Sequence, residues 1–365
     1  MLSRKGWNIM KNFKPNALPL LIGSLPMNNY KEATELIFEY TPEIPLWPQL
    51  PIFCEEGMIE QFMPGLPGLV KEDDKSYLDT SRQGFEEEYL AFFEEYLSVT
   101  EQEKDLESSV FSFTPETGRG FKEFLHQVDE KLDKKETPCV ALKGQVTGPI
   151  TFGTGVKDQT GRSIFYNEKL KEVFVKKLAM NAKFQAKEFA KRGSLPIVFI
   201  DEPSLAGLGT SAYITIAKQD VKETIEEIAD AIHEEGGLAG VHVCANTQWD
   251  ALLTAKIDVI SFDAYSYFEK FFLFPKDIKK YIERGSLLAW GIVPTHKEDI
   301  IKKETVDTLF LKFEEQIKHA VQNGVDKQML LEQIFITPSC GTGSISFKAA
   351  KKVLELTKGL SERVR

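Results

Sequence analysis

The sequence predicts an α/β protein, a (β/α)8 TIM barrel with a helical insertion between its second and third strands. Short apolar runs rich in Val, Ile, Leu and Phe alternate with longer amphipathic segments along the 365 residues. Such runs are typical of parallel strands that are buried on both faces. Eight runs can be counted, and eight strands with helices between them are the number that closes this barrel.

The predicted strands follow one another along almost the whole chain, at residues 18–23, 44–50, 140–144, 197–201, 239–243, 259–263, 287–293 and 335–338. Amphipathic segments predict helices between them, at residues 31–40, 168–192, 221–235, 306–322 and 346–358. In the fourth of these helices Leu309, Phe313 and Ile317 recur at four-residue steps. One face of that helix is therefore expected to be buried.

The stretch between the second and third strands, about residues 70–137, is too long for a plain loop. It contains two helix-like segments, residues 85–97 and 120–134, so we expect a helical insertion that could cover the barrel mouth. No flexible linker divides the chain, and residues 1–365 are expected to form a single catalytic domain with a ragged tail at about residues 1–15.

Composition excludes several classes of protein. The chain has 45 Lys and Arg against 55 Asp and Glu, a formal charge of −10, which disfavours nucleic acid because phosphate neutralisation drives that binding. No apolar run approaches the roughly 20 residues of a membrane span, and the N-terminus lacks the apolar segment of a signal peptide. Four widely spaced cysteines suit a reducing compartment, so a cytoplasmic location is expected.

The candidate metal ligands lie where the predicted strands end, which is where this fold carries its chemistry. His242 and Cys244 alternate on one strand and share a face. Asp263 ends the next strand and Cys340 follows the last. One imidazole and two thiolates, with an optional carboxylate, match tetrahedral Zn²⁺.

His242 and Cys244 alone would also fit a buried histidine beside an inert core cysteine, since free cysteine is often buried. Cys340 in a Pro-Ser-Cys-Gly turn favours the metal site, because metal sites take ligands from converging elements. Cys54 and Cys139 have no such neighbours and are interpreted as structural. A thiol bound to zinc is deprotonated yet nucleophilic, so the ligand set favours alkyl transfer to a substrate sulfur.

Five motifs together resemble a known family: I-G-S-L-P at residues 22–26, M-I-E-Q-F at 58–62, I-D-E-P at 200–203, H-V-C at 242–244 with Cys340, and G-x-x-x-x-H from Gly291 to His296. They resemble the catalytic C-terminal barrel of cobalamin-independent methionine synthase, within the superfamily that includes uroporphyrinogen decarboxylases. The resemblance runs from about residue 18 to residue 358. A single barrel of this kind is similar to the short core methionine synthases of the corrinoid-dependent type.

The resemblance implies a role for each matching residue. Ile22, Gly23 and Ser24 would hold the carboxylate of L-homocysteine, and Glu60 and Asp201 would bind its ammonium group. His242, Cys244 and Cys340 would be the zinc ligands, and His296 the proton donor. The family's fourth zinc ligand is a glutamate, where this chain offers the shorter Asp263. Glu60 and Asp201 could instead be structural carboxylates, and His296 an ordinary loop histidine.

Two departures concern the methyl donor. The family's folate-stacking Trp falls near Gly155, and its folate-binding Glu falls at Gly207. The thiol substrate is therefore expected to be kept and the donor changed to methylcobalamin or another methylcorrinoid, either free or carried by a corrinoid protein. An open mouth near residues 153–155 and 207–209 would admit such a donor. The other interpretation is that these glycines are loop turns and that folate binds through other residues.

The expected function is methyl transfer from a methylcorrinoid to homocysteine, which forms methionine. The alternatives are transfer to another thiol such as coenzyme M, a folate-dependent methionine synthase, a porphyrinogen decarboxylase-like enzyme, or a non-catalytic zinc-binding accessory protein. Coenzyme M has no ammonium group for Glu60 and Asp201 to bind. Porphyrinogen decarboxylation favours Arg at the strand ends, where Arg is scarce. The donor, the direction of flux and the oligomeric state stay open at this point.

Overall fold

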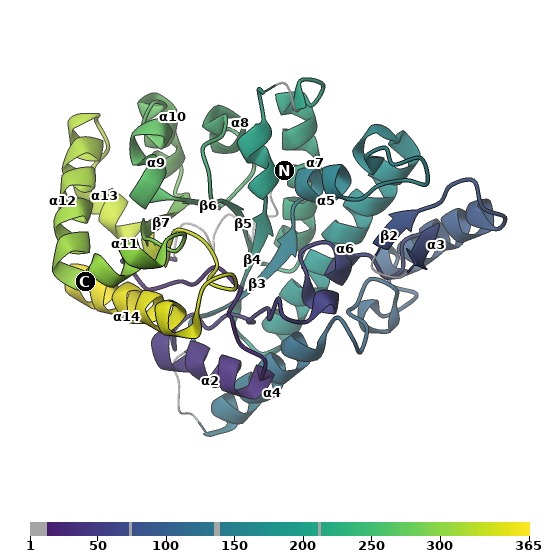
Figure 1. The fold of residues 1–365 in the computed structure, drawn as a ribbon, viewed down its shortest axis with the longest axis horizontal. Coiled ribbons are helices and arrows are strands. Elements are labelled where there is room, and N and C mark those ends of the chain that lie inside the picture. Colours follow the sequence, from purple (N-terminus) through teal and green to yellow (C-terminus); the bar gives the residue numbers. More distant parts are fainter. Residues whose placement is uncertain (1–12, 73–74, 135–138, 211–212) are drawn as a thin grey trace.

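The computed structural model describes residues 13–72, 75–134, 139–210 and 213–365 (Figure 1). Its main sheet has six parallel strands in chain order. These are β3 (Ala141–Thr147), β4 (Leu195–Asp201), β5 (Leu238–Val243), β6 (Val259–Phe262), β7 (Leu287–Val293) and β8 (Ile334–Pro338). They confirm the last six predicted strands, and the sheet curls with helices on its outer side (Figure 1).

The first two predicted strands are not regular strands, and in this the sequence prediction is corrected. Residues 18–23 lie beside β8 through a single parallel bridge, Pro19 to Ile336, and residues 44–50 lie beside β3 through a bridge from Leu46 to Lys143. Prolines interrupt both segments, and proline has no N–H to donate to a ladder. A bridge between Ser24 and Gln49 joins the two segments.

A buried apolar cluster inside the curl contains side chains from both irregular segments and from every strand of the sheet. Its members are Leu18, Leu20, Ile44, Ala141, Ile197, Phe199, Leu238, Val259, Leu287, Ala289 and Phe335. Gly240 makes room for one of them, because a Cβ at this position would lie 2.2 Å from the ring of Phe199. All eight segments therefore contribute to one core.

The five predicted helices are present as α2 (Tyr30–Tyr40), α6 (Glu168–Lys191), α7 (Lys218–Glu234), α12 (Val306–Gln322) and α14 (Phe347–Val364). Shorter helices that the sequence pattern did not predict lie in the connections between strands. They are α5 (Pro149–Gly155), α8 (Trp249–Leu253), α9 (Ala264–Phe271), α10 (Pro275–Glu283), α11 (Glu298–Lys303) and α13 (Lys327–Glu332). Within the described ranges, no helix has the length and apolar character that crossing a membrane requires.

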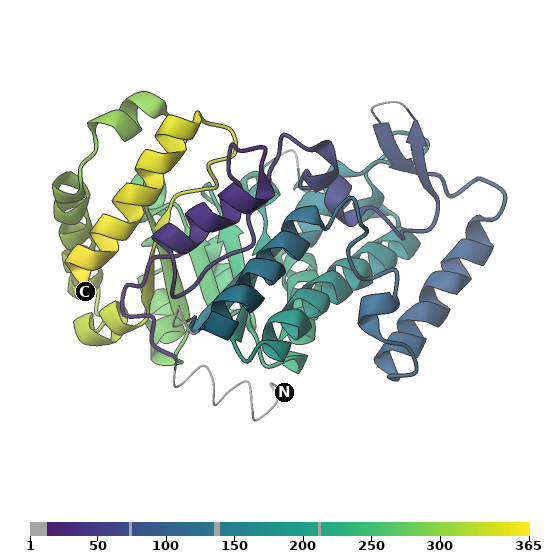
Figure 2. The same ribbon diagram turned by 90° about the horizontal axis from the view of Figure 1, so that it is seen from below.

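The insertion contains both predicted helices, now α3 (Phe85–Thr100) and α4 (Arg119–Lys134). It also contains an unpredicted antiparallel hairpin, β1 (Leu69–Glu72) and β2 (Lys75–Leu78). Residues 73–74 and 135–137 of the predicted insertion lie outside the described residues, as do residues 1–12 of the predicted tail. Helix α4 runs beside α2 and α6 on the outside of the molecule (Figure 2).

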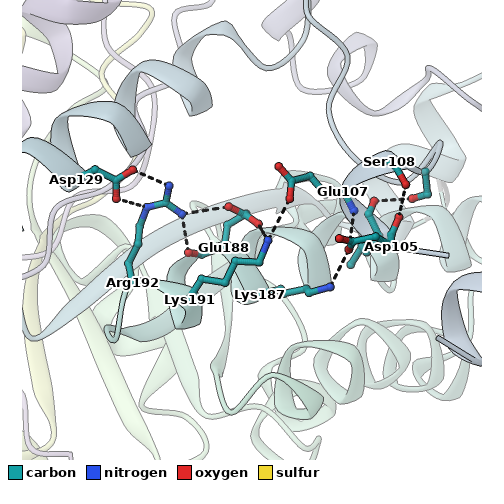
Figure 3. A network of polar contacts seen from close by, with 10 residues as sticks. Asp105, Glu107, Ser108, Asp129, Lys187, Glu188, Lys191 and Arg192 are labelled. Atoms are coloured by element: carbon teal, nitrogen blue, oxygen red, sulfur yellow. Dashed lines mark hydrogen bonds and ion pairs between the residues drawn. The ribbon is translucent and has the colours of Figure 1, made fainter. Parts of the chain in front are cut away.

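Ion pairs fasten the insertion to α6 (Figure 3). Arg192, just beyond α6, binds Asp129 of α4 through two hydrogen bonds of 2.8 Å. Lys187 of α6 binds Asp105 at 3.0 Å. These contacts hold the helical part of the insertion along the side of α6, whereas the sequence suggested a cover over the mouth. The hairpin is the part that contacts a candidate site residue, since Ser76 donates to Glu60 at 2.8 Å.

Candidate metal centre and substrate site

Strand register brings three candidate site residues into one row. Asp201 of β4 pairs with His242 of β5, and His242 pairs with Ser261 of β6. Paired residues of parallel strands point to the same side of a sheet, so the three side chains share a face. The row lies at the carboxyl ends of the strands, where parallel α/β folds bind their ligands.

The ligand atoms of His242, Cys244 and Cys340 all lie within 4.8 Å of one another. In a tetrahedral zinc site with Zn–S bonds of about 2.3 Å, neighbouring ligand atoms are about 3.8 Å apart. The three residues therefore fit a zinc ion with only small adjustments. This is the one such group of His, Cys, Asp or Glu within the described part of the chain.

The ring of His242 is oriented for coordination. Its Nδ1 lies 2.9 Å from Ser261 Oγ, while its buried Nε2 has no hydrogen-bond partner. A metal-binding histidine usually donates its other ring N–H to a neighbouring acceptor, which fixes the tautomer. Ser261 was not a sequence-predicted site residue. Its position two residues before Asp263 places it on the same face, whereas its contact with His242 depends on the register of β5 and β6.

The thiols of Cys244 and Cys340 shift each other's pKa in opposite directions. The hydrogen bond from Cys340 lowers the pKa of Cys244, and the charge of His242 lowers it further. The same contact raises the pKa of Cys340. A pair that readily yields one thiolate, beside an imidazole with a free nitrogen, has the donor chemistry that zinc prefers.

Asp263 is buried at the end of β6, and burial raises the pKa of its carboxyl group. One of its oxygens accepts the backbone N–H of Ser266 at 2.8 Å and caps helix α9. Asp263 is not among the residues whose ligand atoms group together, so its role as a fourth ligand stays a prediction. His296 is exposed in the loop after β7, and its charge opposes the increase that burial causes in the pKa of Asp263.

The loop of Ile22, Gly23 and Ser24 contacts the loop that carries Cys340. Ser24 Oγ accepts the N–H of Gly343 at 3.1 Å, and the Ser24 carbonyl accepts the N–H of Thr342 at 2.9 Å. The backbone N–H groups of Gly23 and Ser24 donate to no acceptor within the described ranges. Two free N–H groups beside the metal ligands can bind a carboxylate.

Asp201 is the acid of this site with an unsatisfied oxygen. Its Oδ1 is buried without a hydrogen-bond partner, and burial raises the pKa of the carboxyl group to about 6. The charges of His242 and Lys143 oppose that increase. A buried carboxylate oxygen without a partner is costly, which is understandable if a cationic ligand supplies the missing partner.

Glu60 starts a short 3-10 helix, η2 (Glu60–Phe62), and is held by Ser76 of the hairpin. The same segment approaches the strand ends, because Thr147 of β3 donates a hydrogen bond to the carbonyl of Met58. Thr147 is the register partner of Asp201. Glu60 therefore comes to the same end of the sheet as Asp201, although no contact joins the two described side chains.

Three glycine positions correct the expectation of an open mouth. A Cβ on Gly155 would lie 3.1 Å from the side chain of Ile59, and one on Gly207 would lie 2.5 Å from the ring of Tyr213. Gly209 is covered in the same way by Gln248. The space that the missing side chains leave is therefore filled by neighbours.

No known family model matches the chain. A methionine synthase of Methanocaldococcus jannaschii is 25% identical over 236 residues, which are 63% of this chain and 68% of that protein. The solved structure of a B12-independent methionine synthase from Shewanella sp. W3-18-1, in complex with selenomethionine, has a TM-score of 0.55 at 15% identity. That comparison covers 95% of this chain and 98% of the other, and it shows a shared fold. The sequence similarity is thus to a methionine synthase, the group that the motifs resemble, and the structural similarity concerns the fold.

Proposed function

We propose that this chain is a zinc-dependent thiol methyltransferase that forms methionine from L-homocysteine. One observation carries the proposal. His242 belongs to the His-Cys-Cys group, and its register partner on the neighbouring strand is Asp201, whose Oδ1 has no hydrogen-bond partner. The similarity to a methionine synthase supports the same reaction. The chain acts as a single cytoplasmic catalytic domain, in which the irregular segments 18–23 and 44–50 close the barrel beside the six strands of the sheet.

Different residues of the site bind the sulfur, the ammonium group and the carboxylate of the substrate. Zinc held by His242, Cys244 and Cys340 would bind the substrate sulfur as a thiolate at neutral pH, which remains a nucleophile. Asp201 and Glu60 bind the ammonium group, and the N–H groups of Gly23 and Ser24 bind the carboxylate. Fixing both charged ends of the amino acid places the sulfur in line with an incoming methyl group.

The proposed donor is a methylcorrinoid, either free methylcobalamin or a methylated corrinoid protein. The support is that Gly155 and Gly207 stand at the two positions where the resembled family binds folate, so that both folate-binding side chains are absent. In this reaction the carbon–cobalt bond breaks, its electron pair stays on cobalt, and the methyl group joins the thiolate sulfur. The leaving group needs no proton, so His296 is dispensable with this donor. A folate leaving group does take up a proton, so His296 becomes necessary if folate is the donor.

A direct assay tests the proposal. Zinc-loaded protein is supplied with L-homocysteine and either methylcobalamin or methyltetrahydrofolate, and methionine is measured by mass spectrometry. We expect methionine from methylcobalamin, faster formation with a methylated corrinoid protein, and none from the folate. His296→Gln should leave the methylcobalamin rate unchanged.

Two cysteine variants distinguish the loss of a metal ligand from a general effect on the fold. Cys244→Ala should lose both zinc and activity, because it removes one of the three ligands. Cys139→Ala should keep both, since the Cys139 thiol is partly buried, burial raises its pKa to about 11, and it contacts the carbonyl of Pro42 at 3.6 Å. Methionine from the folate alone would overturn the proposed donor. A zinc-loaded protein that makes methionine from neither donor would overturn the proposed reaction.

A further inference from the structure

Lys143 is a fully buried lysine inside the curl of the sheet. It lies on β3, and its Nζ donates a hydrogen bond to the carbonyl oxygen of Ile22. The same Nζ lies 3.4 Å from Gln145 Oε1 and 4.5 Å from the ring centroid of Phe199. Burial lowers the pKa of Lys143 to about 8, and the charge of Asp201 opposes this decrease. Burying an ammonium group is costly, so its position calls for a physical reason.

The contact with Ile22 fixes the peptide that carries one of the free N–H groups. The Ile22 carbonyl and the Gly23 N–H belong to the same planar peptide unit and point in opposite directions. A cation on the carbonyl oxygen therefore turns the Gly23 N–H away from Lys143. It also polarises the peptide, which makes that N–H a stronger donor.

We propose that Lys143 is a positioning residue for the substrate carboxylate, which it serves through the Ile22–Gly23 peptide. The inference rests on the proposed function, because it assigns a ligand to the loop of Gly23 and Ser24. Lys143 supplies positive charge behind the carboxylate loop, while Asp201 supplies negative charge at the ammonium end. The two charges are complementary to an α-amino acid that bears a thiol.

The test is the selectivity of thiol binding by the zinc-loaded protein, measured by titration calorimetry at pH 7. The probes are L-homocysteine, γ-mercaptobutyrate, which lacks the ammonium group, and homocysteamine, which lacks the carboxylate. Lys143→Met removes the charge and the donor at similar volume. It should weaken binding of both carboxylate-bearing thiols at least about tenfold, the size of a lost hydrogen bond to a charged group. Homocysteamine binding should not weaken, because the variant removes a charge that repels its ammonium group.

Lys177→Met is the matched control. Lys177 of α6 is also buried, at 2% exposure, and its Nζ also donates to a carbonyl, that of Val110 in the insertion. It lies outside the site, so its loss should leave the binding of all three thiols unchanged. If Lys143→Met does not fold, Lys143→Gln removes the same charge and should show the same loss of carboxylate selectivity. Lys143→Arg keeps the charge and should keep the selectivity.

The outcomes separate this inference from the proposed function. Wild-type protein that binds homocysteine no better than homocysteamine would overturn the amino-acid site itself, and the role of Lys143 with it. Wild-type protein that prefers the carboxylate, together with a neutral Lys143 variant that keeps the preference, would overturn only the role of Lys143. An equal loss for all three thiols would also overturn it, because it would show a general effect on the fold.

Discussion

Asp201 and Glu202 are adjacent acids at the end of β4 with different partners. The Asp201 side chain faces the metal ligands and has an oxygen without a hydrogen bond. Glu202 is fully buried on the other side of the strand and accepts two backbone N–H groups and a hydroxyl from Ile150 and Thr151. Strand alternation predicts this division. Asp201 is expected to bind the ligand, and Glu202 to stabilise the fold.

Replacing Asp201 tests its assigned role at the scale of one residue. Asp201→Asn keeps the shape but removes the charge that binds the ammonium group, so L-homocysteine should bind at least about tenfold more weakly. Binding of γ-mercaptobutyrate should change little, because it has no ammonium group. Zinc content should stay the same, since Asp201 is not a ligand. Calorimetric titration of both thiols measures the effect, and unchanged homocysteine binding would contradict the assignment.

The grouping of His242, Cys244 and Cys340 could be predicted from sequence in part because alternation on a strand is a local rule. Their spacing put His242 and Cys244 on one face, and Cys340 in a Pro-Ser-Cys-Gly turn after another strand favoured a metal site over an inert core. Ser261 and Lys143 received no role, because their roles depend on partners from distant segments. His242 meets Ser261 through strand register, and Lys143 meets Ile22 only when the first segment closes against the sheet. A single sequence does not reveal such pairings.

At the scale of the elements, Glu202 caps helix α5. Its carboxylate accepts the N–H groups of Ile150 and Thr151 at 2.8 and 2.9 Å, the donors that a helix leaves free in its first turn. Gly148 allows this approach, because a Cβ there would lie 2.1 Å from the Glu202 side chain. Burial nevertheless raises the pKa of Glu202 to about 7. Desolvation therefore outweighs the hydrogen bonds.

This shift of the Glu202 pKa predicts a pH dependence of stability. The folded state binds the proton more tightly than the unfolded chain, whose reference pKa is 4.5. The resulting stabilisation is fully present below pH 4.5 and is lost as the pH rises through about 7. Glu202→Gln cannot titrate. The unfolding free energy of the wild type minus that of the variant should therefore fall by up to about 3 kcal/mol between pH 5 and pH 8. Urea denaturation measures it, and a constant difference would refute the prediction.

The ion pairs that attach the insertion to α6 are expected to contribute unequally to the unfolding free energy. The Arg192 side chain is 17% exposed and binds both Asp129 and Glu188. Lys187 is 33% exposed and binds Asp105, which is 58% exposed. Bidentate, half-buried pairs contribute more than solvated ones, so Arg192→Met should lower the unfolding free energy by about 1–2 kcal/mol. Lys187→Met should cost less than about 0.5 kcal/mol. Equal costs in denaturant titrations would show that burial does not decide their strength.

At the scale of the whole molecule, the sequence predicted the order of strands and the location of the insertion. Its patterns did not predict how the first two segments pair. Apolar content marks residues 18–23 and 44–50 as buried, and both contribute to the inner core. Their prolines remove ladder donors, so each is joined to the sheet by a single bridge. The length of the insertion could be seen in the sequence and suggested a cover over the mouth. The ion pairs that hold the insertion along α6 join distant residues and could not be predicted.

This molecule is proposed to bring a thiol substrate onto a zinc ion held by His242, Cys244 and Cys340. X-ray absorption at the zinc edge tests it most directly, because it counts the sulfur atoms bound to the metal. We predict two sulfur ligands at about 2.3 Å in the zinc-loaded protein and three after L-homocysteine is added. A count that stays at two with saturating homocysteine would contradict the claim, as would zinc without cysteine sulfur in its coordination shell.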